Sequence, residues 1–496
     1  MYEDAIDSFR AAQKVDPSFA LAYWGEALSF SQPLWFYEEL PQARAALTKL
    51  GATPEGRLAK AKTPRERGLL QAVEALFGPG ERAGRHAAYA REMAGVASAH
   101  PADDDAQAFY ALALLSTMPR GDAALPIRQR AGAVAETVFA RNPGHPGAAH
   151  YILHAYDHGA LANRALPAAR AYAKIAPAAS HALHMPAHAF LQLGFWDEAA
   201  ASDEASWNAS IAWAKRRGLS IASRDYHSLS WLQYEWTQQG RFSKTKEAIA
   251  FVEAAMKSGS GNRDAGPGKT LSPLHAGGHG YGEQSEIGRG SGEAALRNDR
   301  GSMRARYIIE SERWHEMKGQ TTFDNIEELF ALGLSAVNLA DAARVRVVID
   351  EFRKASAPGQ PAELREQAEI MLRQMETLDL FAQGQRDAAL LVLDRAASLQ
   401  ARMPRPIGRP FPVKDVNELY GELLLQVGRA KEAIGRFDRV LARTPNRSRA
   451  LLGLARAYRN AGDGANARAA YKRVLTNYRL SDPGLPEVAE AREAIR

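Results

Sequence analysis

Residues 445–474, PNRSRALLGLARAYRNAGDGANARAAYKRV, decide the fold class of this chain. Apolar residues recur at helical spacing on both sides of a turn at Gly462 and Asp463, and small residues stand where two helices would touch. The stretch therefore predicts two antiparallel helices joined by a tight turn. The residues that set its pattern, after Pro445, are Leu451, Ala455, Tyr458, Gly462, Ala467 and Tyr471.

This pattern resembles a tetratricopeptide repeat, a unit of about 34 residues with large, small and aromatic side chains at fixed positions. The preceding unit matches through Gly421, Leu424, Gly428, Ala433 and Phe437. The N-terminus follows the same register through Ala5, Phe9, Ala12 and Pro17. The resemblance implies an all-α fold, a tetratricopeptide-like α-solenoid of antiparallel helix pairs. By fold alone it also implies a general role in binding proteins or peptides.

The 496 residues are too many for one compact core, so we expect an elongated array or several domains. We predict an N-terminal array over 1–257 that carries a histidine cluster, a flexible linker over 258–300 and a C-terminal array over 301–496. The linker is rich in Gly and polar residues, with too few apolar residues to fold by itself. Its GPGKT fragment lacks the first glycine of a phosphate-binding loop, so we do not expect nucleotide binding there.

The N-terminus begins in the middle of a repeat, because Met1 falls at position 16 of the unit that contains Phe9. We therefore expect the chain to start inside a longer protein, with the apolar face of residues 2–15 left uncovered. The compartment stays open: cytoplasmic in the absence of a leader, periplasmic if a leader preceded this segment. No stretch reaches the roughly 18 consecutive apolar residues that a membrane span needs.

The composition excludes several kinds of chemistry. The chain has no cysteine, so it has no disulfide, no thiolate nucleophile and no Cys-ligated zinc or iron–sulfur site. Any metal ion must be bound by nitrogen and oxygen donors. The formal net charge of +6 is small for this length and the basic residues are dispersed, so we expect no nucleic-acid partner.

Seven of the thirteen histidines fall within the 78 residues from His150 to His227. Two pairs of them repeat at an offset of 34 residues, which is the repeat period: His150 with His154, and His184 with His188. Residues four apart share a helix face, and adjacent repeat helices pack about 8–10 Å apart. We therefore predict that both pairs direct imidazoles into one space and bind a transition metal through four nitrogens.

His181 and His227 are the further ligands that we expect, with Asp157 or Asp225 as a nearby carboxylate. The resemblance implies the same set, because repeat positions 2, 5 and 9 line the concave groove and these histidines fall on them. Zinc is the default ion, and copper, nickel or iron also suit imidazole and carboxylate donors. The predicted metal ligands are therefore His150, His154, His181, His184, His188 and His227.

The segments around these histidines are similar to motifs of a bacterial group of His-rich tetratricopeptide proteins: HPGAAHYILHAYDH (145–158), SHALHMPAHAF (180–190) and DYHSLSWLQYEW (225–236). The leading hypothesis is a scaffold that holds a metal ion in a His-lined groove and binds a protein or peptide there. The second is a metalloenzyme, a hydrolase or an oxidoreductase, in which the ion activates water or oxygen; the sequence identifies no catalytic residues for it. The third is an adaptor without metal, and histidines that serve packing alone are the fourth.

Charged residues occupy the groove positions near the C-terminus. Asp415, Glu418 and Glu422 stand at positions 2, 5 and 9 of one unit, and Arg449 and Arg456 stand at positions 2 and 9 of the next. We interpret them as a solvated helix face rather than as a second peptide site, because charge runs on a helix usually face water.

Overall fold

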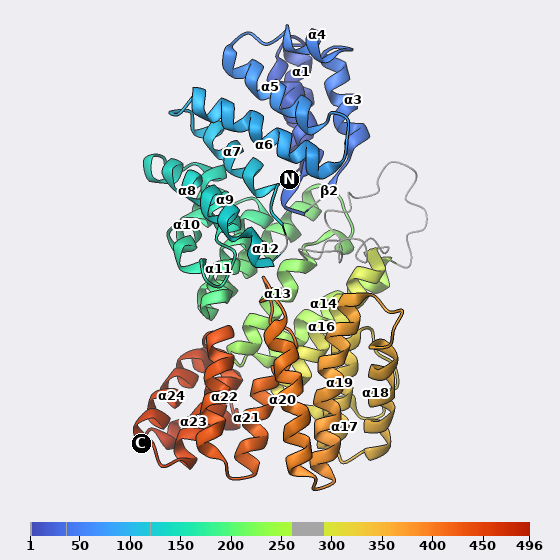
Figure 1. The fold of residues 1–496 in the computed structure, drawn as a ribbon, viewed down its shortest axis with the longest axis vertical. Helices are drawn as coiled ribbons and strands as arrows, with labels where there is room; N and C mark the ends of the chain where they lie inside the picture. Colours follow the sequence, from blue (N-terminus) through green and yellow to red (C-terminus); the bar gives the residue numbers. More distant parts are fainter. Residues whose placement is uncertain (1, 36, 120, 260–291) are drawn as a thin grey trace. The chain divides into compact units, whose positions relative to one another are not determined.

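The computed structural model describes residues 2–35, 37–119, 121–259 and 292–496 (Figure 1). Within these ranges the chain is almost entirely helical, and many helices pack against the helix that follows them. Its strands there, β1 (Ser31–Gln32) and β2 (Tyr37–Glu38), form one antiparallel pair. The predicted all-α solenoid is confirmed. No described helix is long and apolar enough to cross a membrane.

The helices group into two compact units, and the division falls inside a single helix, α11 (Ser180–Leu193). The first unit contains residues 1–157 and 163–186. The described part of the second unit contains residues 158–162, 187–259 and 292–496. Residues 187–257, which we assigned to the N-terminal array, therefore group with the C-terminal helices.

The first unit is a series of helix pairs, in which α5 packs on α6, and α8 packs on both α7 and α9. Its short 3-10 helices are η1 (Pro33–Trp35) and η2 (Gly121–Ala124). Its helices, before the start of α11, are α1 (Tyr2–Val15), α2 (Ala20–Leu28), α3 (Leu40–Leu50), α4 (Pro54–Leu58), α5 (Pro64–Leu76), α6 (Arg82–Ala99), α7 (Asp104–Leu115), α8 (Leu125–Arg141), α9 (Pro146–Ala155) and α10 (Ala162–Ile175).

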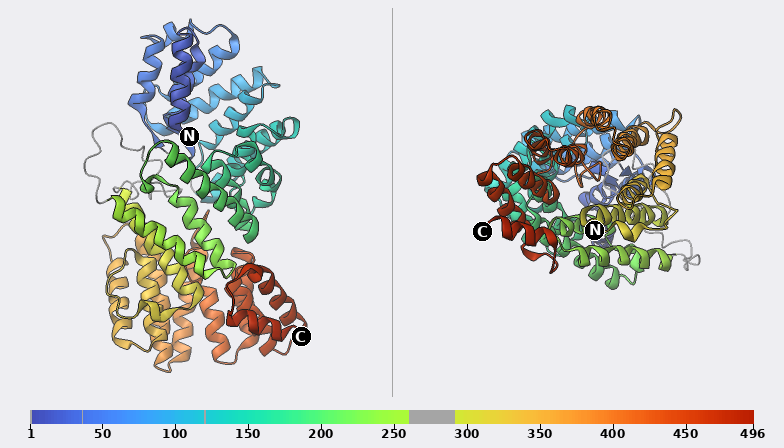
Figure 2. Two further views of the ribbon diagram at one scale, coloured as in Figure 1. Left: turned by 180° about the vertical axis from the view of Figure 1, so that it is seen from behind. Right: turned by 90° about the horizontal axis from the view of Figure 1, so that it is seen from below.

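The second unit brings its first helices against its C-terminal repeats: the Trp196 indole donates a hydrogen bond of 2.9 Å to the Asn446 carbonyl. Figure 2 shows its helices from behind and from below. They are α12 (Trp196–Arg216), α13 (Tyr226–Gln238), α14 (Phe242–Gly259), α16 (Gly292–Ser311), α17 (Ile326–Asn338), α18 (Ala342–Ala355), α19 (Ala362–Ala382), α20 (Arg386–Arg402), α21 (Val416–Gln426), α22 (Ala430–Arg443), α23 (Ser448–Asn460), α24 (Gly464–Asn477) and α25 (Pro486–Ala494). The 3-10 helices are η3 (Ile221–Ser223), η5 (Trp314–Met317) and η6 (Tyr478–Leu480).

The repeat register is visible in how aromatic rings meet glycines. Phe437, at repeat position 24, is fully buried, and a Cβ added at Gly453, position 6 of the next unit, would lie 2.3 Å from its ring. At the other end of the chain, a Cβ added at Gly25 would lie 2.2 Å from the ring of Phe9. Phe9 is also at repeat position 24, and Gly25 is also at position 6 of the repeat that follows. The same close packing of one repeat on the next therefore recurs at both ends of the chain.

The N-terminal helix α1 lies against α2, so one of its faces is covered. Besides the Phe9 contact, the side chain of Gln13 donates 2.7 Å to Glu26, and Arg10 donates 2.8 Å to the same carboxylate. None of the residues of α1 is fully buried. The covered face is the one that the repeat register assigns to contact with the following helix.

The ends of the predicted linker are helical. Helix α14 extends to Gly259 and α16 begins at Gly292, so residues 258–259 and 292–300 belong to helices. The GPGKT fragment, His275 and His279 lie outside the described residues.

A buried ion network joins distant parts of the second unit. The Arg447 guanidinium, 1% exposed, lies 2.6 Å from a Glu418 oxygen and 2.7 Å from a Glu310 oxygen, and Lys414 lies 3.2 Å from Glu418. Burial raises the pKa of Glu418, but the charges of Arg447 and Lys414 outweigh this effect and lower the pKa to about 2. We interpreted Glu418, at position 5 of its repeat, as part of a solvated helix face. This interpretation was wrong, because Glu418 is fully buried.

The other charged groove positions are also paired. Arg449 forms ion pairs with Glu312 and Glu487, and Arg456 lies 2.6 Å from Glu490. These arginines are thus paired with carboxylates from α25 and from the turn after α16.

A pair of buried carboxyl groups lies where α12 packs on α13. Asp203 and Glu235 are both fully buried, and each affects the ionisation of the other. Burial, and then the charge of Asp203, raises the pKa of Glu235 well above its ordinary value. Burial also raises the pKa of Asp203. A proton held by Glu235 and donated to Asp203 is the simplest way to keep both groups inside.

Replacing Glu235 by glutamine is expected to make the pH dependence of stability shallower and the second unit more stable at pH 7. An acid whose pKa is raised in the folded state favours folding only while protonated. The free energy of unfolding of the wild type therefore falls as the pH rises above the pKa of Glu235 in the unfolded chain, which is about 4.3. The fall is up to roughly 1.4 kcal/mol per pH unit. Glutamine cannot ionise and still offers an N–H donor to Asp203. Urea denaturation from pH 4 to pH 8 measures this, and equal slopes for Glu235→Gln and the wild type contradict it.

Candidate metal centre

Helix α9 positions the first two histidines of the site. The helix begins at Pro146, whose fixed φ suits a first helical position, and the His145 ring caps it by accepting a hydrogen bond of 3.1 Å from the Ala148 amide. His150 and His154 follow one turn apart on one face. Their Nε2 atoms are 3.0 Å apart.

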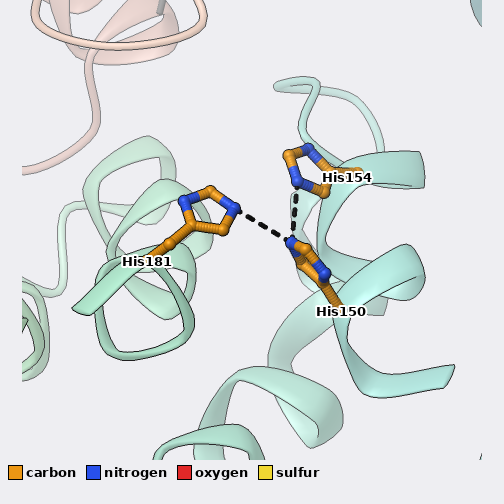
Figure 3. A group of neighbouring side chains, drawn as sticks. All are labelled: His150, His154 and His181. Atoms are coloured by element: carbon orange, nitrogen blue, oxygen red, sulfur yellow. Dashed lines mark hydrogen bonds between the residues drawn. The ribbon is translucent and has the colours of Figure 1, made fainter. Parts of the chain in front are cut away.

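The third histidine comes from the next repeat. His181 is the second residue of α11, and its Nε2 lies 3.0 Å from the Nε2 of His150. Figure 3 shows the three rings turned toward one another, with dashed lines from His150 to each of the other two. All three offer a nitrogen within 4.8 Å of the others, so the group has the spacing of a metal site. We name His150, His154 and His181 the α9–α11 group.

The nitrogen distances suit one shared cation. Two nitrogens that bind one ion at about 2.05 Å lie roughly 3.3 Å apart in tetrahedral geometry and roughly 2.9 Å apart at a right angle. The two observed separations of 3.0 Å fall in this range. An imidazole nitrogen carries either one proton or one lone pair. The Nε2 of His150 cannot form a good hydrogen bond with both neighbours, whereas a cation between them accepts all three lone pairs.

The surroundings hold these rings in place. The ring centroids of Tyr151 and Tyr172 lie 5.5 and 5.6 Å from that of His150, with interplanar angles of 22° and 18°. Burial raises the pKa of both phenols, so they are neutral at physiological pH. His154 is 4% exposed, and its carbonyl accepts a hydrogen bond of 2.7 Å from Arg128. His150 and His181 are half-buried, so an ion can reach the group from solvent.

A second group contains His184 and His188 from α11 and His227 from α13, each with a nitrogen within 4.8 Å of the others. The Trp231 ring lies 4.4 Å from that of His188 and 5.5 Å from that of His227, between centroids. All six predicted ligands are thus placed in groups with metal-site spacing. We name this set the α11–α13 group.

The grouping differs from our prediction of one four-nitrogen cage from His150, His154, His184 and His188. Each pair at positions 5 and 9 instead joins the histidine at position 2 of the following repeat. The first pair therefore takes His181, and the second pair takes His227. Helix spacing identifies the pairs, but the stagger between neighbouring repeats decides which third residue reaches them.

Two other polar candidates near the cluster, Asp225 and His158, stabilise local turns. Asp225 caps α13 by accepting a hydrogen bond of 3.1 Å from the Ser228 amide. His158 accepts 3.2 Å from the Ala160 amide in the turn before α10. Asp157 is 2% exposed. Asp225 and His158 thus stabilise chain turns, and neither belongs to the two groups of three.

Sequence reasoning missed a further polar cluster near the N-terminus. His86 of α6 is 1% exposed, and its Nε2 lies 3.7 Å from Glu38 of β2. Burial lowers the pKa of His86, so this ring is neutral at physiological pH. The signal in the sequence is the run of Arg82, Arg85, His86 and Tyr89, which falls on one helix face where apolar residues would be usual.

The comparisons with known proteins agree with the repeat pattern. A family model described as Tetratricopeptide repeat matches residues 421–482. The chain is similar to the human IFIT1 dimer with m7Gppp-AAAA, at 12% identity over 88% of this chain and 86% of that one, with a TM-score of 0.35. It is also similar to yeast Tom70, at 12% identity over 99% and 85% of the two chains, with a TM-score of 0.32.

A third similar structure is a tetratricopeptide repeat protein from Parabacteroides merdae ATCC 43184, at 14% identity over 64% of this chain and 97% of that one, with a TM-score of 0.27. At these identities and TM-scores the structural likenesses carry no argument about function. No curated protein matches the chain. The family model thus places a tetratricopeptide repeat at residues 421–482, and the contacts of Phe437 and Phe9 with glycines follow one repeat register at both ends of the chain.

Proposed function

We propose that this chain is a tetratricopeptide-repeat scaffold that binds a transition-metal ion at the α9–α11 group, with the α11–α13 group as a second site. Zinc is the ion that we expect, because neutral imidazoles suit it and no thiolate is present to favour softer ions. A protein or peptide in the concave groove is the expected partner. The bound ion either shapes this groove or contacts the partner directly.

One observation carries the proposal: the Nε2 of His150 lies 3.0 Å from the Nε2 atoms of both His154 and His181. Neutral imidazoles gain one hydrogen bond at most from such a cluster, and protonated ones repel each other. A divalent cation removes both difficulties. The proposal therefore rests on the convergence of three lone pairs and not on the number of histidines.

The same group supports a second candidate, a metalloenzyme. Three protein ligands leave the fourth position of a tetrahedral zinc ion open, and catalytic zinc sites use that position for water or substrate. The half-buried His150 and His181 leave this side of the group accessible. We place this activity second, because this accessible side of the group is the one feature that favours it.

Metal analysis tests the proposal. Protein stripped with a chelator and reloaded with zinc is expected to bind two ions per chain, and His150→Ala is expected to bind one. The affinity at the α9–α11 group should fall by more than about 100-fold, because one of three ligands is lost. Elemental analysis and competition with a chromogenic chelator measure both quantities.

His315→Ala is the matched control, because His315 is exposed and belongs to neither group. It should retain the full zinc content. Equal zinc content in His150→Ala and the wild type would contradict the site. If neither the wild type nor the control binds metal, the metal-free adaptor is the remaining hypothesis. In the cobalt-substituted protein, a visible spectrum that azide changes supports an open position and so the metalloenzyme.

A further inference from the structure

Trp231 of α13 lies beside the two histidines that the second unit contributes to the α11–α13 group. Its ring centroid lies 4.4 Å from that of His188, at an interplanar angle of 37°, and 5.5 Å from that of His227, at 52°. His227 precedes Trp231 by one helical turn, so the two share a face of α13. The indole is 3% exposed. It therefore forms a wall that limits the orientations open to these two imidazoles.

A glycine from a distant part of the chain touches the same indole. Gly408 belongs to the connection between α20 and α21, residues 403–415, and a Cβ added to it would lie 2.5 Å from Cζ2 of Trp231 and 3.1 Å from Cη2. Carbon atoms in ordinary contact are roughly 3.5–4.0 Å apart. The backbone of Gly408 is not in the left-handed region. The contact with the ring is therefore what requires glycine at this position.

The connection is held on both sides of Gly408. Arg443 of α22 donates a hydrogen bond of 3.2 Å to the carbonyl of Pro404, and Arg306 of α16 donates one of 3.0 Å to the carbonyl of Pro410. Arg306 is 3% exposed, so its hydrogen bond is protected from water. The connection therefore cannot move away from the indole without breaking contacts with two other helices.

The indole also packs into an apolar cluster. The other members of this cluster are Leu191, Trp196 and Tyr234. Because side chains in such a cluster are closely packed, a displacement of the ring is transmitted to its neighbours. A methyl group in place of the glycine hydrogen would therefore shift the indole relative to His188 and His227.

We propose that Trp231 is a positioning residue of the α11–α13 group and that the connection between α20 and α21 holds it in place through Gly408. This inference rests on the proposed metal binding at that group. Ligands that are already held in the bound orientation lose less side-chain entropy when the ion binds. The affinity for the second ion thus depends on the packing of a connection that lies outside the group.

The test uses the full chain with His150→Ala, in which the α11–α13 group is the remaining zinc site. Competition with a chromogenic chelator gives the zinc affinity. Trp231→Phe and Gly408→Ala, each made in this background, should weaken zinc binding by about 10-fold. Phenylalanine lacks the indole atoms Cζ2 and Cη2, so it also makes room for the new methyl group. Adding Gly408→Ala to Trp231→Phe should therefore cause little further loss.

Gly333→Ala is the matched control for a close contact elsewhere in the second unit. A Cβ at Gly333 of α17 would lie 2.8 Å from the side chains of Met375 and Val348, and these residues belong to neither histidine group. This variant strains the packing of the unit but should bind zinc like the background. The visible spectrum of bound cobalt reports the ligand geometry, so it should change in Gly408→Ala and stay the same in Gly333→Ala.

Several results would overturn the inference. Equal zinc affinity in Gly408→Ala and the background would do so while leaving the metal site intact. Equal losses in Gly408→Ala and Gly333→Ala would show an effect of general stability, and additive losses with Trp231→Phe would show that the glycine does not act through the indole. Absence of zinc from the His150→Ala background would overturn the second metal site itself, and the inference with it.

Discussion

Arg447→Met is expected to lower the free energy of unfolding by about 3–5 kcal/mol, because it leaves the buried carboxylates Glu418 and Glu310 without their main counter-charge. The guanidinium is fully used: it also donates 3.4 Å to the Val413 carbonyl. Methionine fills similar space but offers no charge. Urea denaturation at pH 7 measures the loss, since urea does not screen ion pairs as guanidinium salts do.

The pH dependence of this loss has a definite sign. The folded-state pKa of Glu418, about 2, lies below its ordinary value of 4.5. The wild type therefore holds this stabilisation above roughly pH 4.5 and loses it as the pH falls toward 2, so the difference from Arg447→Met narrows in acid.

Arg353→Met is the control for this experiment. Arg353 is paired with Asp350 and Glu376 but is 57% exposed, so its loss should lower stability by less than about 1 kcal/mol. Equal losses in the two variants would show that burial of the Arg447 network has no special effect.

Phe437→Ala is expected to lower the free energy of unfolding by about 3–5 kcal/mol, because it removes a fully buried ring that fills the space between two repeats. The ring lies against Gly421 on one side and Gly453 on the other, and neither position has room for a Cβ beside it. Phe323→Ala, at a ring that is 39% exposed, is the control with a smaller expected loss. Denaturant titration of both variants gives the comparison.

The contact can be tested from its other side. Gly453→Ala should destabilise the wild type, because its Cβ would lie 2.3 Å from Phe437. In the Phe437→Ala background the same change should be tolerated and gain up to about 1 kcal/mol, since alanine favours a helix interior over glycine. Additive effects in the double variant would contradict direct contact between these two positions.

The fold could be predicted because a repeat needs only local rules. Aromatic, small and glycine residues at fixed spacing, such as Gly421, Phe437 and Gly453, determine how one helix meets the next, and the same rule holds for Phe9 and Gly25. The division into units could not be predicted in this way. It depends on contacts such as that between Trp196 and Asn446, which are far apart in sequence.

The candidate site could be predicted in part. Helical periodicity places His150 and His154 on one face, and both lie together in the structure. Which histidine completes the group depends on the stagger between adjacent helices, which spacing does not encode, so His181 was expected only as an additional ligand. The surroundings of charged positions were harder still to predict, because Glu418 is covered by Arg447, which lies 29 residues further along the chain.

The two histidine groups share a rule of assembly: positions 5 and 9 of one repeat with position 2 of the next. Each group therefore belongs to a junction between neighbouring repeats, and no single repeat carries a complete group by itself. A duplication that inserts one more copy of such a repeat would create an additional histidine group without any point mutation. Deletion of one repeat would remove a complete group. The number of histidine groups in this architecture can thus change in evolution through the gain or loss of single repeats.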